Sequence, residues 1–402
     1  MDFFVEYAKY MNPIKVNNET IEFVDNAEHV GMLRSNAGNH PTILARFKAH
    51  RQALASVLHV GLARGHRGNP AAGFKVHQLY GTPVLMSGLA PLLLSKSEIT
   101  IIEQHYKETI RSLQRLHSCT PSPVIYFLAG SLPGIALLHQ RQLSLFGMIS
   151  RLPDNILHEH AKNIFSSETI ANKSWFTQIR ELCLCYRLPH PLNILSTPPS
   201  KEVFKKMVKS RIIDYWEIKL REEASLLPSL HYFNPSFMSL SSTHPLWSTA
   251  GSSPSKVAMA TIQAQMLSGR YRSQKLCRHW SNQTSGFCLL SESCSSSFED
   301  LPHILSSCSA LQDVREKLKS FTVNYSNTVP VLKSLILQYS QPSHPLFCQF
   351  MLDCSVLPHV ISAKQLHGTW ILDHLFHISR TLVYTLHRTR MKFRIKKIKL
   401  KN

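Results

Sequence analysis

The sequence predicts a mainly α-helical protein with a short β-hairpin near its N-terminus and a small Cys/His knuckle near its C-terminus. Apolar side chains recur at helical spacing through most of the chain. Turn residues and short apolar runs typical of strands are confined to the first 36 residues. Residues 277–310 are rich in Ser and Cys and too poor in apolar side chains for an ordinary core, so this segment is either disordered or held by a cross-link or metal.

Each element follows from a local pattern. The Asn17-Asn18 turn, with Ile21, Phe23 and Val24 before Val30 and Met32, predicts a hairpin or β-meander. The clearest helix spans Ser97 to His117, with Ser97 as the expected N-cap and Glu98 in the first turn. Between 153 and 250, Pro-rich connectors separate short helices. Further helices are expected over about 43–58, 71–90, 135–150, 201–223, 256–268, 311–340 and 363–390.

The charge balance limits the possible chemistry. The 402 residues include 45 Lys and Arg but only 25 Asp and Glu, a net charge of +20, while 44% of the residues are apolar, which excludes wholesale disorder. There is no Asp-Asp pair, and the only adjacent acids are Glu222-Glu223 and Glu299-Asp300. Because polymerases and nucleases hold Mg²⁺ with clustered carboxylates, we expect no Mg²⁺ site in this chain.

The location is predicted from apolar runs and cysteines. The most apolar window, 80–94, is interrupted by Pro83 and Pro91 and is shorter than the roughly 20 residues of a membrane span. The first residues lack the basic and apolar regions of a secretory signal. Nine cysteines, an odd number, favour a reducing compartment. We therefore expect a nuclear or cytoplasmic protein with no membrane segment.

The sharpest motif is Cys288-x5-Cys294-x8-His303-x4-Cys308. Three thiolates and an imidazole are ligands that Zn²⁺ prefers, and a closed set of four would be structural. Five residues between the first two cysteines make a wider loop than usual. On an ideal helix His303 and Cys308 would lie about 140° apart, so His303 must sit at or before a helix start, which Pro302 permits. Cys277 and His279 are rival ligands, and a loop with free cysteines is the alternative.

Two basic segments are candidates for phosphate binding. The chain ends on eight cations interleaved with apolar residues, an alternation that predicts a strand or extended arm. This end fits phosphate contacts or a nuclear-import signal, and the alternative is a solvated tail. A Gly-flanked loop with Arg64 and Arg67 could add contacts, although an ordinary helix–helix loop is favoured there. The eight terminal cations are Arg388, Arg390, Lys392, Arg394, Lys396, Lys397, Lys399 and Lys401.

Several motifs together resemble reverse transcriptases of non-LTR retrotransposons. Ala27 to Arg34 resembles the hairpin that follows the family's catalytic motif, and Leu79 to Leu85 with the 97–117 helix resembles its thumb. Gly130 to Pro133 with Leu138 and Arg141 to Leu143, and Thr385 to Arg390 near the end, resemble later segments of the family. Cys288, Cys294, His303 and Cys308, with Glu299-Asp300 between them and Arg315 after them, resemble its Cys-Cys-His-Cys knuckle.

The resemblance implies four regions. These are a remnant of the palm hairpin with thumb helices (1–118), a helical Pro-rich linker region (119–250), a knuckle-like segment (251–320) and C-terminal helices with the basic tail (321–402). The family's catalytic aromatic-x-Asp-Asp motif and upstream Asp are absent, and the chain is expected to begin after them.

We therefore predict a non-catalytic fragment that binds RNA, DNA or both through phosphate contacts, with structural zinc and no small-molecule substrate. One alternative is part of an active RNA-directed DNA polymerase whose catalytic motifs lie upstream, on another exon or chain. The other alternative is an inert product of a decayed element. An open reading frame encoding the Asp-Asp motif just upstream would favour the first alternative.

Overall fold

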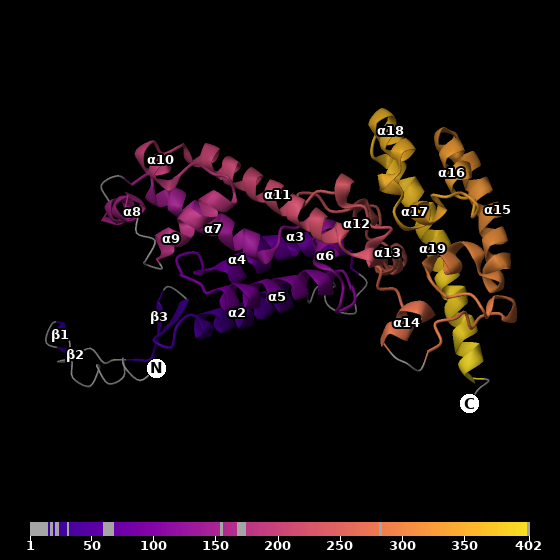
Figure 1. Cartoon of the computed structure of the whole chain (residues 1–402), viewed down its shortest axis with the longest axis horizontal. Helices are drawn as coiled ribbons and strands as arrows, with labels where there is room; N and C mark the ends of the chain where they lie inside the picture. Colours follow the sequence, from indigo (N-terminus) through magenta and orange to yellow (C-terminus); the bar gives the residue numbers. More distant parts are fainter. Residues whose placement is uncertain are drawn as a thin grey trace.

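A computed structural model describes residues 15–16, 19–20, 24–29, 32–58, 68–152, 156–166, 174–280 and 284–399. As the sequence predicts, the described residues are mainly helical, with an antiparallel hairpin near the N-terminus and a Cys/His group toward the C-terminus. Helices α2 to α12 form one elongated bundle, and α13 to α19 form a second helical unit beside it (Figure 1).

The first unit, called the N-terminal bundle below, contains helices of very different length. They are α2 (His40–Leu58), α3 (Pro70–Val76), the π-helical η1 (His77–Gly81), α4 (Thr82–Met86), α5 (Lys96–Leu113), α6 (Ser122–Ala129), α7 (Gly134–Ile149), α8 (Ile156–Ser166), α9 (Trp175–Cys185), α10 (Pro191–Ser196), α11 (Lys201–Ser225), the 3₁₀ turns η2 (Pro228–Leu230) and η3 (Pro235–Phe237), and α12 (Pro245–Ser248).

The second unit, called the C-terminal unit below, is built around its last helix. Its elements are α13 (Pro254–Leu267), α14 (Gln274–Trp280), η4 (Glu292–Cys294), η5 (His303–Ser307), η6 (Ser309–Leu311), α15 (Gln312–Thr328), η7 (Pro330–Leu332), α16 (Lys333–Tyr339), α17 (Phe347–Leu352), η8 (Cys354–Val356), α18 (Pro358–His367) and α19 (Trp370–Lys399).

The predicted hairpin is present as β3 (Asn26–His29) paired antiparallel with β4 (Met32–Ser35). A second short pair, β1 (Lys15–Val16) with β2 (Glu19–Thr20), precedes it. The Thr42 hydroxyl of α2 donates a 2.6 Å hydrogen bond to the Leu33 carbonyl, so β4 is attached to the bundle. The predicted turn at Asn17-Asn18 and the predicted strand residues Ile21, Phe23 and Val30 lie outside the described residues. The prediction of Val24 as a strand residue is wrong, because β3 begins only at Asn26.

The N-cap of helix α5 lies two residues earlier than predicted. The cap is Ser95 and not Ser97, because Ser95 and Glu98 form a capping box: the Ser95 hydroxyl accepts from the Glu98 amide, and the Glu98 carboxylate accepts from the Ser95 amide at 2.7 Å. The helix then buries Ile102, Tyr106 and Ile110 on one face, as their spacing predicts.

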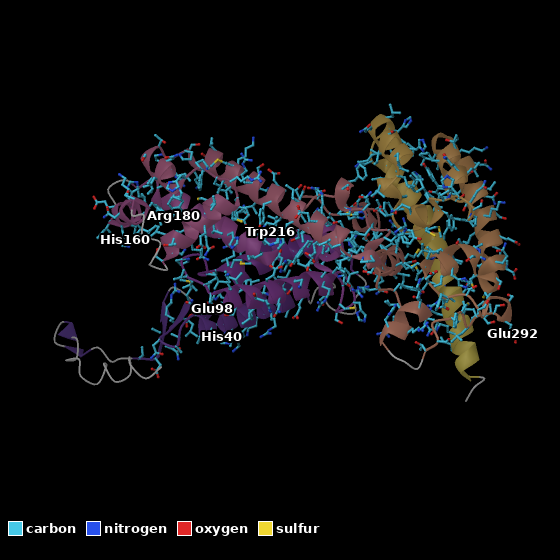
Figure 2. All side chains as sticks on the ribbon, viewed as in Figure 1. His40, Glu98, His160, Arg180, Trp216 and Glu292 are labelled. Carbon is cyan, nitrogen blue, oxygen red and sulfur yellow. The ribbon has the colours of Figure 1, made fainter. Side chains whose placement is uncertain are left out.

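Helix α11 closes the N-terminal bundle over α7. It buries a stripe at every fourth position, including Phe204, Val208, Ile212 and Trp216. In Figure 2 the Trp216 side chain points from α11 into the bundle, where its indole N–H donates to the Tyr186 hydroxyl at 3.1 Å. The predicted amphipathic helix over 201–223 is therefore confirmed.

The segment 244–249, which contains α12 and Trp247, joins the two units. The Trp247 side chain is fully buried, and its indole N–H donates to the Gln114 side chain of the N-terminal bundle at 3.3 Å. From the other side, the Arg380 guanidinium on α19 donates to the Thr249 carbonyl at 3.0 Å. The His244 ring lies 3.3 Å from the Asp353 carboxylate, again across the two units. The junction is thus both packed and hydrogen-bonded.

The end of the chain differs from the prediction in two ways. The single helix expected over 363–390 is instead α18 and α19, separated at Gly368, whose φ of +91° a side chain would strain. The basic end is not a strand or extended arm, because α19 continues to Lys399. A helix satisfies its backbone hydrogen bonds internally, whereas a strand here would need a partner strand.

Candidate metal centre

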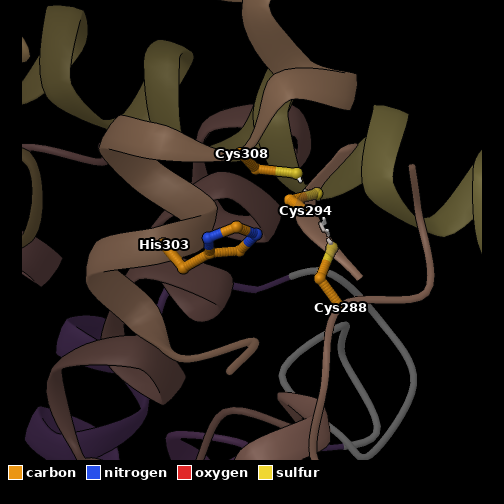
Figure 3. A group of neighbouring side chains, drawn as sticks. All are labelled: Cys288, Cys294, His303 and Cys308. Atoms are coloured by element: carbon orange, nitrogen blue, oxygen red, sulfur yellow. Dashed lines mark hydrogen bonds between the residues drawn. The ribbon is translucent and has the colours of Figure 1, made fainter. Parts of the chain in front are cut away.

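The four residues predicted to bind metal come together. Cys288, Cys294, His303 and Cys308 are all buried, and one ligand atom of each lies within 4.8 Å of the others (Figure 3). The Sγ atoms of Cys288 and Cys294 are 3.4 Å apart, and those of Cys288 and Cys308 are 3.9 Å apart. Residues distributed over a 21-residue segment therefore point at one centre that could hold a metal ion.

A short hairpin accounts for the wide spacing of the first two cysteines. The Cys288 amide donates to the Ser297 carbonyl at 2.9 Å, and the Phe287 and Phe298 rings stack with centroids 4.7 Å apart. Cys294 lies in the 3₁₀ turn η4 at the tip of this hairpin. The hairpin folds Cys294 back over Cys288, so no tight turn between the two cysteines is needed.

A π-helical turn aligns the other two residues. The Cys308 amide donates to the His303 carbonyl at 2.7 Å, an i→i+5 bond that closes η5. The turn is therefore wider than an α-helical turn, and His303 and Cys308 approach the same side instead of lying about 140° apart as on an ideal α-helix. The Asp300 carboxylate accepts from the His303 amide at 3.1 Å and anchors the start of this turn. His303 is the first residue of η5, but Leu301 and Pro302 before it are already helical, so the wide turn and not a helix start at His303 brings the two residues together.

The electrostatics of the centre favour a thiolate. A hydrogen bond from the Cys308 thiol outweighs burial and lowers the pKa of Cys288 to about 3. The same contact, together with burial, raises the pKa of Cys308. The His303 Nε2 atom is buried without a hydrogen-bond partner among the described residues, while Nδ1 lies 3.4 Å from the Ser307 hydroxyl. Nε2 is therefore the ring atom free to bind a cation.

Arg315 holds the backbone next to the last ligand of the centre, Cys308. Its buried guanidinium donates to the Cys308 carbonyl at 2.5 Å and to the Gln312 side chain at 2.9 Å. The downstream Arg of the predicted knuckle thus holds the backbone of the last cysteine. The rival ligands Cys277 and His279 lie on α14 and are not members of the buried group of four.

The predicted phosphate-binding residues differ in how exposed they are in the structure. Arg388 and Lys392 are exposed on α19, and Arg394 is partly buried. Lys396, Lys397 and Lys399 lie on the last turns of α19, while Lys401, Arg64 and Arg67 lie outside the described residues.

Arg390 is the exception among the terminal cations. Its side chain is 1% exposed and forms an ion pair with the buried Glu299 carboxylate. The assignment of Arg390 as a surface contact is therefore corrected. Its position four residues after the buried Leu386, on the apolar face of α19, was the signal in the sequence that predicts burial.

A histidine cluster in the N-terminal bundle was not predicted. His50 on α2 lies between two other histidines, its Nδ1 2.9 Å from His105 Nε2 and its Nε2 3.1 Å from His77 Nε2. His77 Nδ1 lies 3.4 Å from the Thr82 hydroxyl. Burial lowers the pKa of His50 to about 3 and that of His77 to about 4, so both rings are neutral near pH 7. Their positions, 27 and 28 residues apart, carry no pattern that marks a cluster.

Searches of protein-family models, curated proteins and solved structures find no match to this chain. The reverse-transcriptase resemblance therefore stays a prediction from its motifs. Among the described helices, none alone is long and apolar enough to cross a membrane, and α6 with α7 reaches that length and apolarity only as a pair bent by 64°.

Proposed function

We propose that this chain is a non-catalytic nucleic-acid-binding protein of the non-LTR reverse-transcriptase lineage, stabilised by zinc in its knuckle. The buried group of Cys288, Cys294, His303 and Cys308 is the observation that carries the proposal. Three sulfurs and one imidazole nitrogen select Zn²⁺ over the hard cations that bind oxygen ligands. A Zn–S bond of about 2.3 Å sets tetrahedral S–S edges of about 3.8 Å. The distances from the Cys288 sulfur to those of Cys294 and Cys308, 3.4 and 3.9 Å, lie on either side of that value.

The zinc would be structural under this proposal. Four protein ligands complete a tetrahedron, which leaves no coordination position for a water or a substrate. The chain's own residues prepare the site: Arg315 holds the Cys308 backbone, Asp300 caps the turn that carries His303, and the hairpin folds Cys294 onto Cys288. In this role the metal supplies folding free energy to a segment that is poor in apolar side chains.

The exposed end of α19 supports the nucleic-acid part of the proposal. Arg388 and Lys392 present positive charge to solvent, and residues 388–402 contain no acidic side chain. Met391, Phe393 and Ile395 are also 37 to 51% exposed on this helix. Cations bind phosphates, and an exposed aromatic ring offers a face on which a base can stack. Binding through phosphates carries no base information, so we expect little sequence preference.

Two measurements test the proposal. The first is zinc per chain after dialysis, expected near one for the wild type and reduced for Cys294→Ser. Equal zinc in both proteins would refute Cys294 as a ligand.

The second measurement is filter binding of short RNA and DNA duplexes between about 50 and 200 mM salt. With Arg390 buried, seven terminal cations remain for contacts, and the log–log salt slope can reach about −6. No binding at low salt, or a flat salt response, would refute the proposed function.

A further inference from the structure

The buried ion pair between Glu299 and Arg390 connects the knuckle to the basic helix. The two side chains are 0% and 1% exposed. Arg390 also donates to the Arg272 carbonyl at 2.9 Å and to the Tyr271 hydroxyl at 3.1 Å, and its guanidinium lies 5.2 Å from the centre of the Tyr271 ring. Arg390 is therefore fixed in a closed set of partners, and among its described partners Glu299 is the one that carries negative charge.

Glu299 in turn is part of the knuckle's own scaffold. Its amide donates to the Gly286 carbonyl at 3.0 Å, at the open end of the hairpin that carries Cys288 and Cys294. The next residue, Asp300, anchors the turn that carries His303. The Glu299 carboxylate also accepts from the Gln274 amide at 3.0 Å, at the first residue of α14. Any ligand that fixes the hairpin and the π-helical turn relative to each other also fixes this carboxylate.

The neighbouring ion pair offers a contrast. Lys275 and Asp300 are 3.1 Å apart, but their side chains are 50% and 33% exposed. Water screens such a pair, so its removal changes little. Removing one partner of the buried pair leaves an uncompensated charge in the interior, which is far more costly. The two pairs lie on adjacent residues and thus form a matched comparison.

We propose that Glu299 and Arg390 form a latch through which metal occupancy of the knuckle positions the basic end of α19. The bound metal holds the hairpin and the π-helical turn together, and Glu299 between them holds Arg390. Arg390 in turn fixes the orientation in which Arg388 and Lys392 meet solvent. Without the metal, the carboxylate loses its support and the helix after Leu386 opens more often. This inference rests on the proposed function, to which it adds regulation by metal.

Amide hydrogen exchange of residues 388–395 in the full chain tests the latch. The chain is measured zinc-loaded and after treatment with a chelator. We expect exchange about 100-fold faster without zinc, which is the effect of breaking a buried ion pair. Glu299→Gln should produce a similar increase even with zinc bound, whereas the control Lys275→Gln should leave the exchange rates unchanged. Equal rates with and without zinc, or equal rates in Glu299→Gln and Lys275→Gln, would overturn the latch.

A single variant that is destabilised overall would also exchange faster, so a double-mutant cycle is needed to isolate the effect of the ion pair. Glu299→Gln, Arg390→Met and the combined variant are compared in the same exchange experiment. Because the pair acts as a unit, the combined variant should exchange no faster than the faster single variant. Exchange that multiplies the two single effects would overturn the latch. Nucleic-acid binding is measured separately, so a zinc-dependent latch in a chain that binds no nucleic acid would refute the proposed function and leave the latch standing.

Discussion

Among the described residues, the histidine chain of the N-terminal bundle and the Cys/His group of the knuckle are built on opposite principles. In the N-terminal bundle, His50 uses both ring nitrogens on its neighbours His77 and His105, so the rings form a chain. In the knuckle, the ligand atoms of four residues converge within 4.8 Å, and His303 Nε2 has no hydrogen-bond partner among the described residues. A chain of rings satisfies itself with hydrogen bonds, whereas a convergent group of ligand atoms can hold a cation at its centre.

The difference teaches that residue type alone does not define a metal site. Three histidines in contact offer excellent ligands, yet each nitrogen of His50 faces a different partner. Four convergent donors instead bring their lone pairs and thiolate charge to one point, where a single cation can contact all of them. The predictions below separate the two clusters by their responses to metal, protons and substitution.

Metal removal should have the largest effect, and only in the knuckle. Chelation should remove on the order of 10 kcal/mol of local folding free energy, because four buried ligand atoms would lose the ion that joins them. Hydrogen exchange over 284–311 should accelerate strongly while α2, α5 and α7 stay protected. The matched control is Cys183→Ala, which changes a buried cysteine of the N-terminal bundle and should retain zinc. Unchanged exchange in the knuckle after chelation would contradict the metal site.

Acidification should lower the stability of the protein through the buried histidines His50 and His77. Burial lowers the pKa of His50 to about 3 and of His77 to about 4, whereas unfolded histidines titrate near 6.5. The unfolded chain therefore binds more protons as pH falls below about 6.5, so stability is lost on acidification and is full above that pH. At pH 5 each ring should cost on the order of 2 kcal/mol.

Urea unfolding of the chelator-treated chain at pH 7 and pH 5 measures this loss without interference from zinc release. His50→Gln removes one titrating ring and should reduce the stability lost between pH 7 and pH 5 by about 2 kcal/mol, although it lowers stability at pH 7. His231→Gln, which changes an exposed histidine, should leave the pH dependence as it is. If the His50→Gln and His231→Gln variants lose the same unfolding free energy between pH 7 and pH 5, the buried histidine chain is not the source of the acid sensitivity.

The cap of α5 should contribute a smaller effect within the N-terminal bundle. Ser95→Ala removes the hydroxyl that accepts from the Glu98 amide and should cost about 1 kcal/mol of unfolding free energy. Ser97→Ala, two residues further on, should cost only a few tenths. Urea denaturation compares the two variants directly. A larger loss of unfolding free energy in Ser97→Ala would show that Ser97 is the N-cap, as predicted from the sequence.

The exposed end of α19 should show the smallest effect. Lys392→Gln should make the salt slope of nucleic-acid binding shallower by about one unit, because one phosphate contact is lost. Lys275→Gln removes an equal charge away from this helix and serves as the control. Identical slopes in the two variants would place the phosphate contacts elsewhere on the molecule.

Several features could be predicted from sequence because they depend on local pattern. Apolar spacing is enough to place α5 and α11, since a helix buries one stripe. The cap of α5 was misplaced because both Ser95 and Ser97 precede a good helix, and Glu98 stands three residues after Ser95 only. The strand predicted at the basic end failed because alternation describes one strand but not the partner that a strand needs.

By itself, the sequence determined the helical class, the N-terminal hairpin and the identity of the four knuckle residues, because periodicity and ligand chemistry are properties of residue type and spacing. The tertiary structure decided how those residues meet. The π-helical turn that aligns His303 with Cys308, the choice of Glu299 as the partner of Arg390 and the histidine chain around His50 all depend on contacts that no spacing encodes. Which residues meet in the interior is a property of the packed chain. Arg390, predicted as a surface cation, is therefore found as the buried partner of Glu299.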